Sequence, residues 1–247
     1  GASDKTIKEE SLQEEFTVGE VVEYLCSDEI EDREYNKEGN QMIDIPLGLR
    51  TSIETQNCVL FVGAGIGHHF KTPDGNNAPD GKELCQLLCD KFSIDYKQNR
   101  NLSQIAEFVE LKKGRKELET FITSKLNGLT PDETFKWITT VRWKSIYTTN
   151  YDNCIERAYQ MSNNPLQNPI SFSITSDIKY HQPIIDVPIY HIHGYMLSED
   201  NSNIIITKTD YAKFRKKRQM LFELLKAEMV TASILYVGYS NTDPNWE

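Results

Sequence analysis

Short apolar runs alternate with stretches of helical periodicity along most of the chain. The segments Cys58 to Val62 and Ser233 to Tyr239 are nearly continuous apolar runs of strand length, which predicts buried strands. We expect further strands at about 143–149, 171–175, 188–193 and 203–207. Because parallel strands need crossover connections, strands separated by helices predict an α/β fold with a doubly wound, Rossmann-like parallel sheet.

Apolar residues at helical spacing predict the helices that connect these strands. The expected helices cover residues 45–57, 82–92, 102–113, 115–126, 131–139, 152–161 and 209–231. Four of these helices fall between the predicted strands at 58–62 and 143–149. We therefore interpret the region of about 82–140 as an inserted helical module over the ligand-binding edge of the sheet.

The first part of the chain has a different character. Residues 4–44 are rich in acidic side chains and carry two capping-box spacings, Ser11 to Glu14 and Thr17 to Glu20, which predicts an N-terminal helical extension. Residues 1–3 have the composition of a cloning remnant. The main domain is expected to span 45–247. Since the chain stops where a helix should follow the last strand, we expect a longer parent protein.

The net charge is −10, from 37 acidic and 27 basic residues, which argues against direct nucleic-acid binding. The one basic run, Lys213 to Arg218, is interpreted as the solvated face of a helix. No apolar run approaches the roughly 18 residues that span a bilayer, so we expect a cytoplasmic protein. The five cysteines include no C-x-x-C pair, and we interpret Cys85 and Cys89 as core residues.

Four short polar or glycine-containing motifs follow predicted strands. In a parallel sheet the carboxyl ends of the strands meet at one edge, where open α/β folds bind ligands. The four motifs are therefore expected to form one site. They are Gly63-Ala64-Gly65, Thr148-Thr149-Asn150-Tyr151-Asp152, His191-Ile192-His193-Gly194 and Val237-Gly238-Tyr239-Ser240.

The glycine turn at 63–65 has two interpretations. Glycines directly after a buried strand let the backbone approach a pyrophosphate, whose charge unpaired amide groups can meet. The same glycines can serve only as a tight packing turn. The segment falls short of the full dinucleotide fingerprint, because His68 and His69 follow where that fingerprint needs a glycine-led helix start.

The second motif ends a strand immediately before a predicted helix. Asp152 has a complete structural explanation as the N-cap of that helix. Asn150 does not, and its amide offers both a donor and an acceptor that could fix a ribose hydroxyl or a water.

The two histidines of the third motif, His191 and His193, alternate with Ile192 and are expected on one face of a strand end. A metal site would need further ligands, and no carboxylate or cysteine set stands nearby to complete one. A histidine beside a glycine at a strand end is typical of a general base. One of the two is equally compatible with a buried, hydrogen-bonded core position.

Taken together and in this order, the motifs resemble the SIR2 superfamily, and more closely its prokaryotic SIR2-like domains than the protein-deacylating sirtuins. The similarity runs from about residue 45 to the end of the chain. The four zinc-binding cysteines of the deacylases are missing, Ile66 and Gly67 follow the glycine turn where the family has serine at the second place, and Thr149 replaces the usual glutamine.

The resemblance implies loss of nicotinamide from NAD+ through an oxocarbenium-like state, with no metal. Asn150 would orient the ribose or the attacking water, and His193 would act as the general base. In the family, the remaining matched positions hold the cofactor. Here these are Gly63, Ala64, Gly65, Thr149, Asp152, Gly238, Ser240 and Asp243.

The prokaryotic members that this chain resembles deplete NAD+ during phage infection and are fused to, or paired with, a sensor or assembly module. The resemblance therefore implies an oligomeric effector of anti-phage defence with such a partner. Three other functions stay open. They are a protein deacylase or ADP-ribosyltransferase, a non-catalytic sensor of NAD+ or ADP-ribose, and a dehydrogenase.

Overall fold

The computed structural model describes residues 46–95, 101–173, 182–196 and 204–239 of the chain. These residues belong to one compact unit, 44–247, and the chain divides at residue 43. The predicted extension at 4–44 lies outside the described residues.

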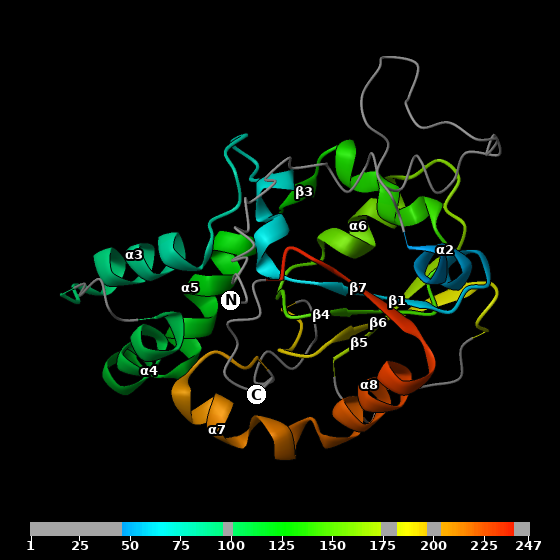
Figure 1. Cartoon of the computed structure of the whole chain (residues 1–247). Coiled ribbons are helices and arrows are strands. Elements are labelled where there is room, and N and C mark those ends of the chain that lie inside the picture. The colour runs from blue at the N-terminus through cyan, green and yellow to red at the C-terminus, as the bar shows by residue number, and fades with distance from the viewer. Residues whose placement is uncertain (1–45, 96–100, 174–181, 197–203, 240–247) are drawn as a thin grey trace, which may run out of the picture. The chain divides into compact units, whose positions relative to one another are not determined.

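Five parallel strands form the central sheet, which confirms the predicted doubly wound α/β fold (Figure 1). Their order across the sheet is β5, β6, β4, β1, β7, so β4 lies at the centre, with β1 and β7 on one side of it and β6 and β5 on the other. The strands are β5 (Asn168–Phe172), β6 (Asp186–His191), β4 (Ser145–Thr148), β1 (Cys58–Val62) and β7 (Ser233–Val237). Strand β1 has the predicted bounds, and all five of its residues are buried.

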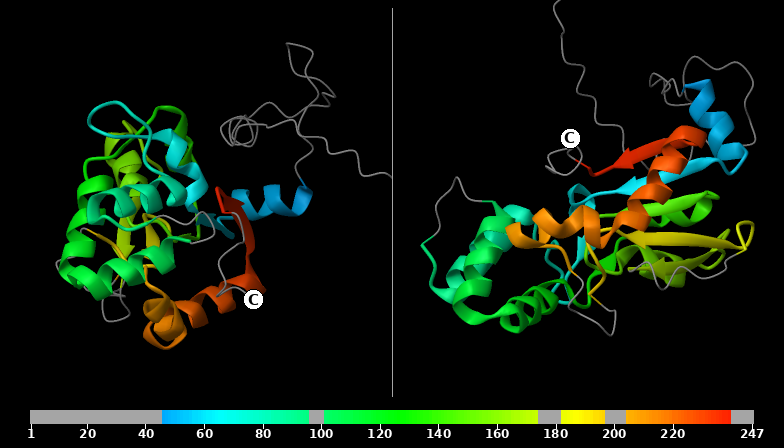
Figure 2. Two further views of the ribbon diagram at one scale, coloured as in Figure 1. Left: turned by 90° about the vertical axis from the view of Figure 1, so that its left-hand side faces the viewer. Right: turned by 90° about the horizontal axis from the view of Figure 1, so that it is seen from below.

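Helices cover both faces of this sheet (Figure 2). On one face lie α6 (Cys154–Met161) and the 3₁₀ helix η2 (Thr134–Thr140), and on the other lie α7 (Lys208–Lys217) and α8 (Gln219–Thr231). The short helix α2 (Leu47–Glu54) precedes β1. A buried cluster joins alternate residues of the central strands, Val59, Phe61 and Tyr147, to Phe214 and Leu225 of α7 and α8.

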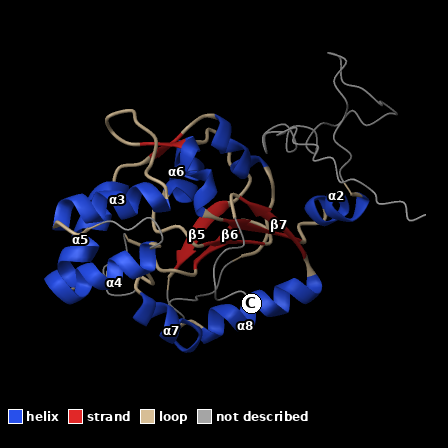
Figure 3. Cartoon of the chain, turned by 60° about the vertical axis from the view of Figure 1, so that its left-hand side comes forward, coloured by secondary structure: helices blue, strands red, loops and turns tan. Residues whose placement is uncertain are grey.

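Three helices lie beyond the carboxyl ends of the strands (Figure 3). They are α3 (Gly81–Phe92), α4 (Leu102–Lys113) and α5 (Arg115–Leu126), and the last two have the predicted bounds. The 3₁₀ helix η1 (Ala64–His69) follows β1, and a small antiparallel ribbon joins β2 (Phe70–Lys71) to β3 (Thr130–Pro131).

Two predictions near this module need correction. The helix expected at 131–139 is the 3₁₀ helix η2, which begins at Thr134 because Pro131 pairs with Phe70 in the ribbon. The strand expected at 203–207 does not form in its described part, 204–207. There the Ile205 amide donates instead to the carbonyl oxygen of His193, 2.7 Å away.

The single helix predicted at 209–231 is two helices, and Arg218 separates them. Its backbone leaves the helical region at φ −116° and ψ 18°, and its side chain is buried. The guanidinium Nε donates to the carbonyl oxygen of Ile192, 3.2 Å away. The basic run is therefore solvated only in part, because its last arginine turns inward.

Candidate active site

The four motifs meet at one edge of the sheet because the strands before them end in register. Val62 of β1 pairs with Thr148 of β4 and with Val237 of β7, and Thr148 pairs in turn with His191 of β6. One row thus crosses four strands. The next residues along each strand are Gly63, Thr149, Ile192 and Gly238.

The glycine turn interlocks with the backbone after β7. The amide of Gly63 donates to the carbonyl oxygen of Val237 at 2.9 Å, and that of Gly65 donates to the carbonyl oxygen of Gly238 at 2.7 Å. A Cβ atom at Gly63 or Gly65 would lie only 2.5 or 2.7 Å from the Gly238 carbonyl oxygen. Close backbone approach therefore accounts for these glycines, and the amides expected to meet a pyrophosphate are already engaged at both positions.

Asn150 is held in the sheet edge by its backbone and its side chain. It is 8% exposed, its amide N–H donates to Thr148 Oγ1 at 3.0 Å, and its Nδ2 donates to the carbonyl oxygen of Gly63 at 3.4 Å. Because a carbonyl oxygen only accepts, this contact fixes which end of the amide faces Gly63. The Oδ1 atom is buried and accepts no hydrogen bond from the described residues. Asn150 thus offers an acceptor to a ligand.

His193 lies in the turn after β6 and is 5% exposed. Its ring packs edge-on against Tyr211, with centroids 5.4 Å apart, and against Phe214 at 5.2 Å, both from α7. The ring of Tyr151 lies 6.3 Å away. Aromatic walls exclude water around this imidazole, which suits a base that acts on a bound substrate.

The two histidines do not share one face, contrary to the expectation from their spacing. The chain turns after His191, so the ring of His191 lies against α6 and that of His193 against α7, on opposite sides of the sheet. His191 is fully buried, and its Nε2 lies 2.7 Å from Oε1 of Glu156. It is the buried, hydrogen-bonded core histidine that the sequence left open. No cluster of three metal-ligating side chains occurs among the described residues.

Asp152 stands between Asn150 and helix α6. The helix begins at Cys154 with Asn153 as its N-cap residue, two positions later than predicted, and Asn153 makes no side-chain cap. Asp152 nevertheless satisfies the first helical amide, because its Oδ1 accepts from the N–H of Cys154 at 2.9 Å. Burial raises the pKa of the Asp152 carboxyl above its usual value.

A cleft of about 590 Å³ opens at this edge of the sheet. Ala64, Gly65, Thr149 and Gly238 form its floor, and its walls come from the first turns of α3, α4 and α7. Each of these helices starts with a capping box, so three positive helix ends surround the cleft. The wall residues are Asp80, Gly81, Lys82, Asn101, Leu102, Ser103, Lys208, Tyr211 and Tyr239.

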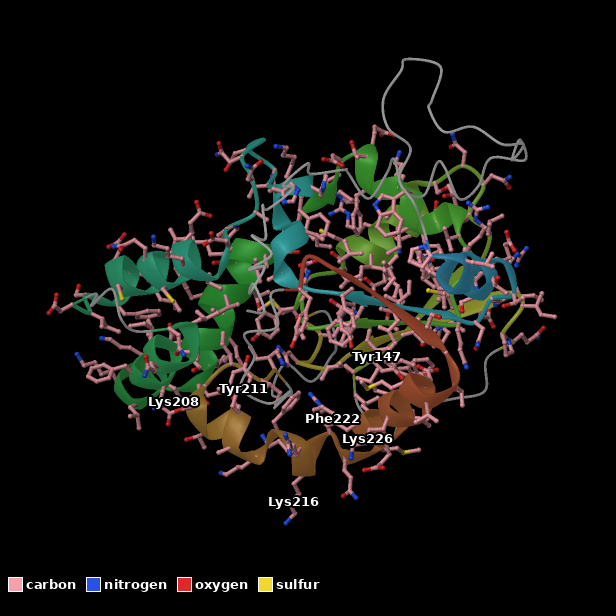
Figure 4. All side chains as sticks on the ribbon, in the orientation of Figure 1. Tyr147, Lys208, Tyr211, Lys216, Phe222 and Lys226 are labelled. Carbon is pink, nitrogen blue, oxygen red and sulfur yellow. The ribbon has the colours of Figure 1, made fainter. Side chains whose placement is uncertain are left out.

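The predicted site residues omit the wall residues Lys82, Lys208 and Tyr211. Lys208 and Tyr211 lie at the start of α7 (Figure 4), and Tyr211 links the cleft to His193 through the ring contact above. For Lys208 and Tyr211 the sequence signal is the capping box Thr207 to Asp210, which predicts where a helix begins but not where that helix lies in the fold. Ser240 and Asp243 were also predicted to bind the cofactor and lie outside the described residues.

A second groove, of about 540 Å³, is lined by residues of α7 and α8, among them Lys216, Phe222 and Lys226, which Figure 4 labels. It contains none of the strand-end residues. We therefore assign the candidate site to the cleft at the sheet edge.

A known domain family matches the C-terminal part of the chain. The family model of SIR2-like domains matches residues 144–247, which include Asn150, Asp152 and His193. The predicted resemblance to the SIR2 superfamily is thereby confirmed.

The chain is also similar to curated bacterial proteins. It is 27% identical over 200 residues to the NAD(+) hydrolase ThsA of Enterococcus faecium, a match that covers 79% of this chain and 40% of that protein. It is 24% identical over 197 residues to the NAD(+) hydrolase ThsA of Cytobacillus dafuensis, covering 79% and 38%. The protein of the same name from Bacillus cereus (strain MSX-D12) is 24% identical over 195 residues. The chain thus spans about two fifths of the length of these relatives.

Proposed function

We propose that this domain hydrolyses NAD+ at the bond between nicotinamide and ribose, releasing nicotinamide and ADP-ribose. The observation that carries the proposal is the buried Asn150, which follows the cleft residue Thr149 and whose Nδ2 is fixed on Gly63 while its Oδ1 has no hydrogen-bond partner among the described residues. The similarity to proteins named NAD(+) hydrolases supports the choice of substrate.

In the proposed reaction, Asn150 Oδ1 accepts a hydrogen bond from a ribose hydroxyl or from the attacking water. This contact orients the reacting group as positive charge develops on the ribose. His193 removes a proton from the same ribose hydroxyl or water as general base. The water adds to the anomeric carbon, nicotinamide leaves with the bonding electron pair, and no metal takes part.

The cleft supports binding of the rest of the dinucleotide. Lys82 and Lys208 line it, and the positive ends of three helices surround it, which favours a pyrophosphate. Thr149, Gly65 and Gly238 would contact the nucleotide from the floor. Asp152 would hydrogen-bond the nicotinamide carboxamide from the start of α6, where burial raises the pKa of its carboxyl.

The test is chromatographic identification of the products formed from NAD+ by the full-length protein. We expect nicotinamide and ADP-ribose, and Asn150→Ala should lower the rate at least about 100-fold. His193→Ala should do the same. Failure of the wild-type protein to release nicotinamide under any activating condition, with Asn150→Ala no different, would refute the proposal. Label from NAD+ that appears on protein instead of in free ADP-ribose would indicate a transferase.

We also propose that the domain is the NAD-depleting effector of an anti-phage defence system in the cytoplasm. In this proposal the domain acts as an oligomer, together with a sensor module that is either fused to it or a separate protein. The resemblance to prokaryotic SIR2-like domains supports it. Among the described residues, no helix combines the length and apolar character that a membrane crossing requires. The corresponding test is the NAD+ content of phage-infected cells that carry the full-length gene or its Asn150→Ala variant.

A further inference from the structure

The ring of His191 is enclosed between two oxygen atoms. Its Nε2 lies 2.7 Å from Oε1 of Glu156, and its Nδ1 lies 3.4 Å from the backbone carbonyl oxygen of Asn150. A carboxylate and a carbonyl oxygen only accept hydrogen bonds. Donation from both ring nitrogens satisfies both contacts, and in that form His191 is an imidazolium with Glu156 as its counter-ion.

Glu156 is itself fixed from a second strand. It is 6% exposed on α6, and the hydroxyl of Ser171 in β5 donates to the same Oε1 atom. Burial alone would raise the pKa of Glu156, but the charge and hydrogen bond of His191 and the hydroxyl of Ser171 lower it below the usual value. The carboxylate therefore stays charged and keeps the imidazole of His191 in place.

We propose that Glu156 and His191 form a positioning pair for Asn150, acting on the reaction through the Asn150 backbone without touching the substrate. This inference rests on the proposed function of Asn150. Thr148 Oγ1 accepts from the Asn150 N–H, Gly63 accepts from its side chain, and His191 donates to its carbonyl oxygen. Three contacts from three strands thus fix the residue, and His191 is the one that carries charge.

The chemistry of the pair predicts how a change at Glu156 reaches Asn150. Without the carboxylate, a buried imidazolium has no counter-ion and loses one proton. A deprotonated Nδ1 then presents a lone pair to the Asn150 carbonyl oxygen, and the contact that held the backbone is lost. The Oδ1 atom of Asn150 shifts with it, and displacement of about 1 Å at a reacting group costs about 100-fold in rate.

The kinetic test compares Glu156→Gln with wild type and with Tyr159→Phe. Tyr159 lies on the same helix and donates to the carbonyl oxygen of Ile138, so its variant loses a buried hydrogen bond away from the site. We expect Glu156→Gln to lower kcat about 10- to 100-fold with KM changed less than about threefold. Tyr159→Phe should keep the wild-type kcat. A wild-type kcat in Glu156→Gln would overturn the inference.

A double-mutant cycle separates positioning from general stabilisation. If Glu156 acts through Asn150, Glu156→Gln should slow the Asn150→Ala enzyme less than about twofold, because the group it positions is gone. Equal slowing of the wild-type and Asn150→Ala enzymes would show that the pair acts independently. Should Glu156→Gln not fold, Ser171→Ala retains the carboxylate and should lower kcat in the same direction by a smaller factor.

A second measurement needs no turnover. Long-range ¹H–¹⁵N spectra of the histidine-labelled protein report which ring nitrogens carry protons. We expect two protonated nitrogens in His191 of the wild type and one in Glu156→Gln, whereas one in the wild type would overturn the inference. This readout stands even if the protein releases no nicotinamide, so failure of the proposed function and failure of the positioning pair remain distinguishable.

Discussion

The side-chain amide of Asn150 donates to the main-chain carbonyl oxygen of Gly63, 3.4 Å away across the edge of the sheet. The end of β1 thereby orients the residue that follows β4. The amide nitrogen donates within the protein, whereas the amide oxygen accepts nothing from the residues that the structure describes. The function of the glycine turn thus includes orienting a candidate catalytic side chain, in addition to close packing against Gly238.

This contact predicts that Asn150→Asp is as damaging as removal of the side chain. An aspartate keeps an acceptor toward the cleft but sets a second oxygen against the Gly63 carbonyl, which only accepts. We expect kcat for NAD+ cleavage to fall about 100-fold. The same substitution at Asn153, which makes no side-chain cap on α6, is the matched control and should retain activity. Comparable rates in Asn150→Asp and wild type would contradict the assigned role.

The cleft predicts a binding role for Lys208. Its side chain lines the cleft at the positive end of α7, whereas Lys216 on the same helix does not. Lys208→Gln should raise KM for NAD+ about 3- to 10-fold with little change in kcat, since it removes one charge-assisted contact to a phosphate. Lys216→Gln should leave both constants unchanged. Steady-state kinetics at low and high salt checks this, because screening should shrink the difference between Lys208→Gln and wild type.

How far the sequence alone leads differs between the fold and the site. Strand β1 and helices α4 and α5 lie where they were predicted, because apolar runs and capping residues are local signals. The break at Arg218 has no such signal. It depends on a buried contact to Ile192, which follows β6 and lies 26 residues away in sequence, and neither glycine nor proline marks it.

The same limit applies to the site. Strand order and register bring the four motifs together, and their order along the chain was enough to predict that edge. The partner of His191 was missed, because Glu156 appears in the sequence only as one acidic residue of an amphipathic helix. The strand β6 also ends at His191, and the chain turns before His193. The two side chains therefore lie on opposite faces of the sheet, which the alternation of a continuous strand does not predict.

The close approach of the glycine turn to the backbone of Gly238 predicts that alanine substitution at Gly65 and at Gly67 has different effects on stability. A Cβ at Gly65 would lie 2.7 Å from the backbone oxygen of Gly238, whereas a Cβ at Gly67 would meet nothing within 4 Å. Gly65→Ala should lower the free energy of unfolding by about 1–3 kcal/mol through overpacking. Gly67→Ala should stay within about 0.5 kcal/mol of wild type. Urea unfolding of the two variants checks this, and equal stabilities would contradict the close approach.

The contacts of Arg115 connect helix α5 of the helical module to α7. Its guanidinium contacts Asp210 at 2.6 Å, Glu119 at 2.7 Å and the carbonyl oxygen of Ile204 at 2.6 Å. Arg115→Gln removes the nearest counter-charge of two largely buried carboxylates, of which Asp210 keeps Lys217 at 3.8 Å. We expect a loss of about 2 kcal/mol, less than for a fully buried pair because Arg115 is 24% exposed.

The control for Arg115 is an exposed ion pair. Lys226 lies 3.4 Å from Glu223, and both side chains are more than 60% exposed. Lys226→Gln should change the free energy of unfolding by less than about 0.5 kcal/mol. A similar loss in both variants, measured by denaturant unfolding at one salt concentration, would show that the Arg115 network carries no special weight.

Two carboxyl groups on either side of the start of α6 predict opposite pH dependences of stability. The pKa of Glu156 is lowered in the folded protein, so its carboxylate stabilises the fold above the unfolded pKa of about 4.3, and this contribution is lost as the pH falls through the folded pKa. Glu156→Gln should therefore destabilise the protein at neutral pH and progressively less below about pH 4.

Asp152 has the reverse sign, because burial raises its pKa. The folded state holds the proton more tightly than the unfolded state, so the charged carboxylate costs stability once the pH rises above the unfolded value of about 3.9. Asp152→Asn keeps the acceptor for the Cys154 amide and removes the charge, so it should raise the free energy of unfolding at pH 7 and approach wild type near pH 3.

If Asp152 contacts the nicotinamide carboxamide, the same variant should lose activity while gaining stability, the combination expected where a site keeps a group that the fold disfavours. Thermal unfolding from pH 3 to 8 with NAD+ cleavage assays separates the two effects, and an Asp152→Asn protein that is less stable at pH 7 would contradict the argument.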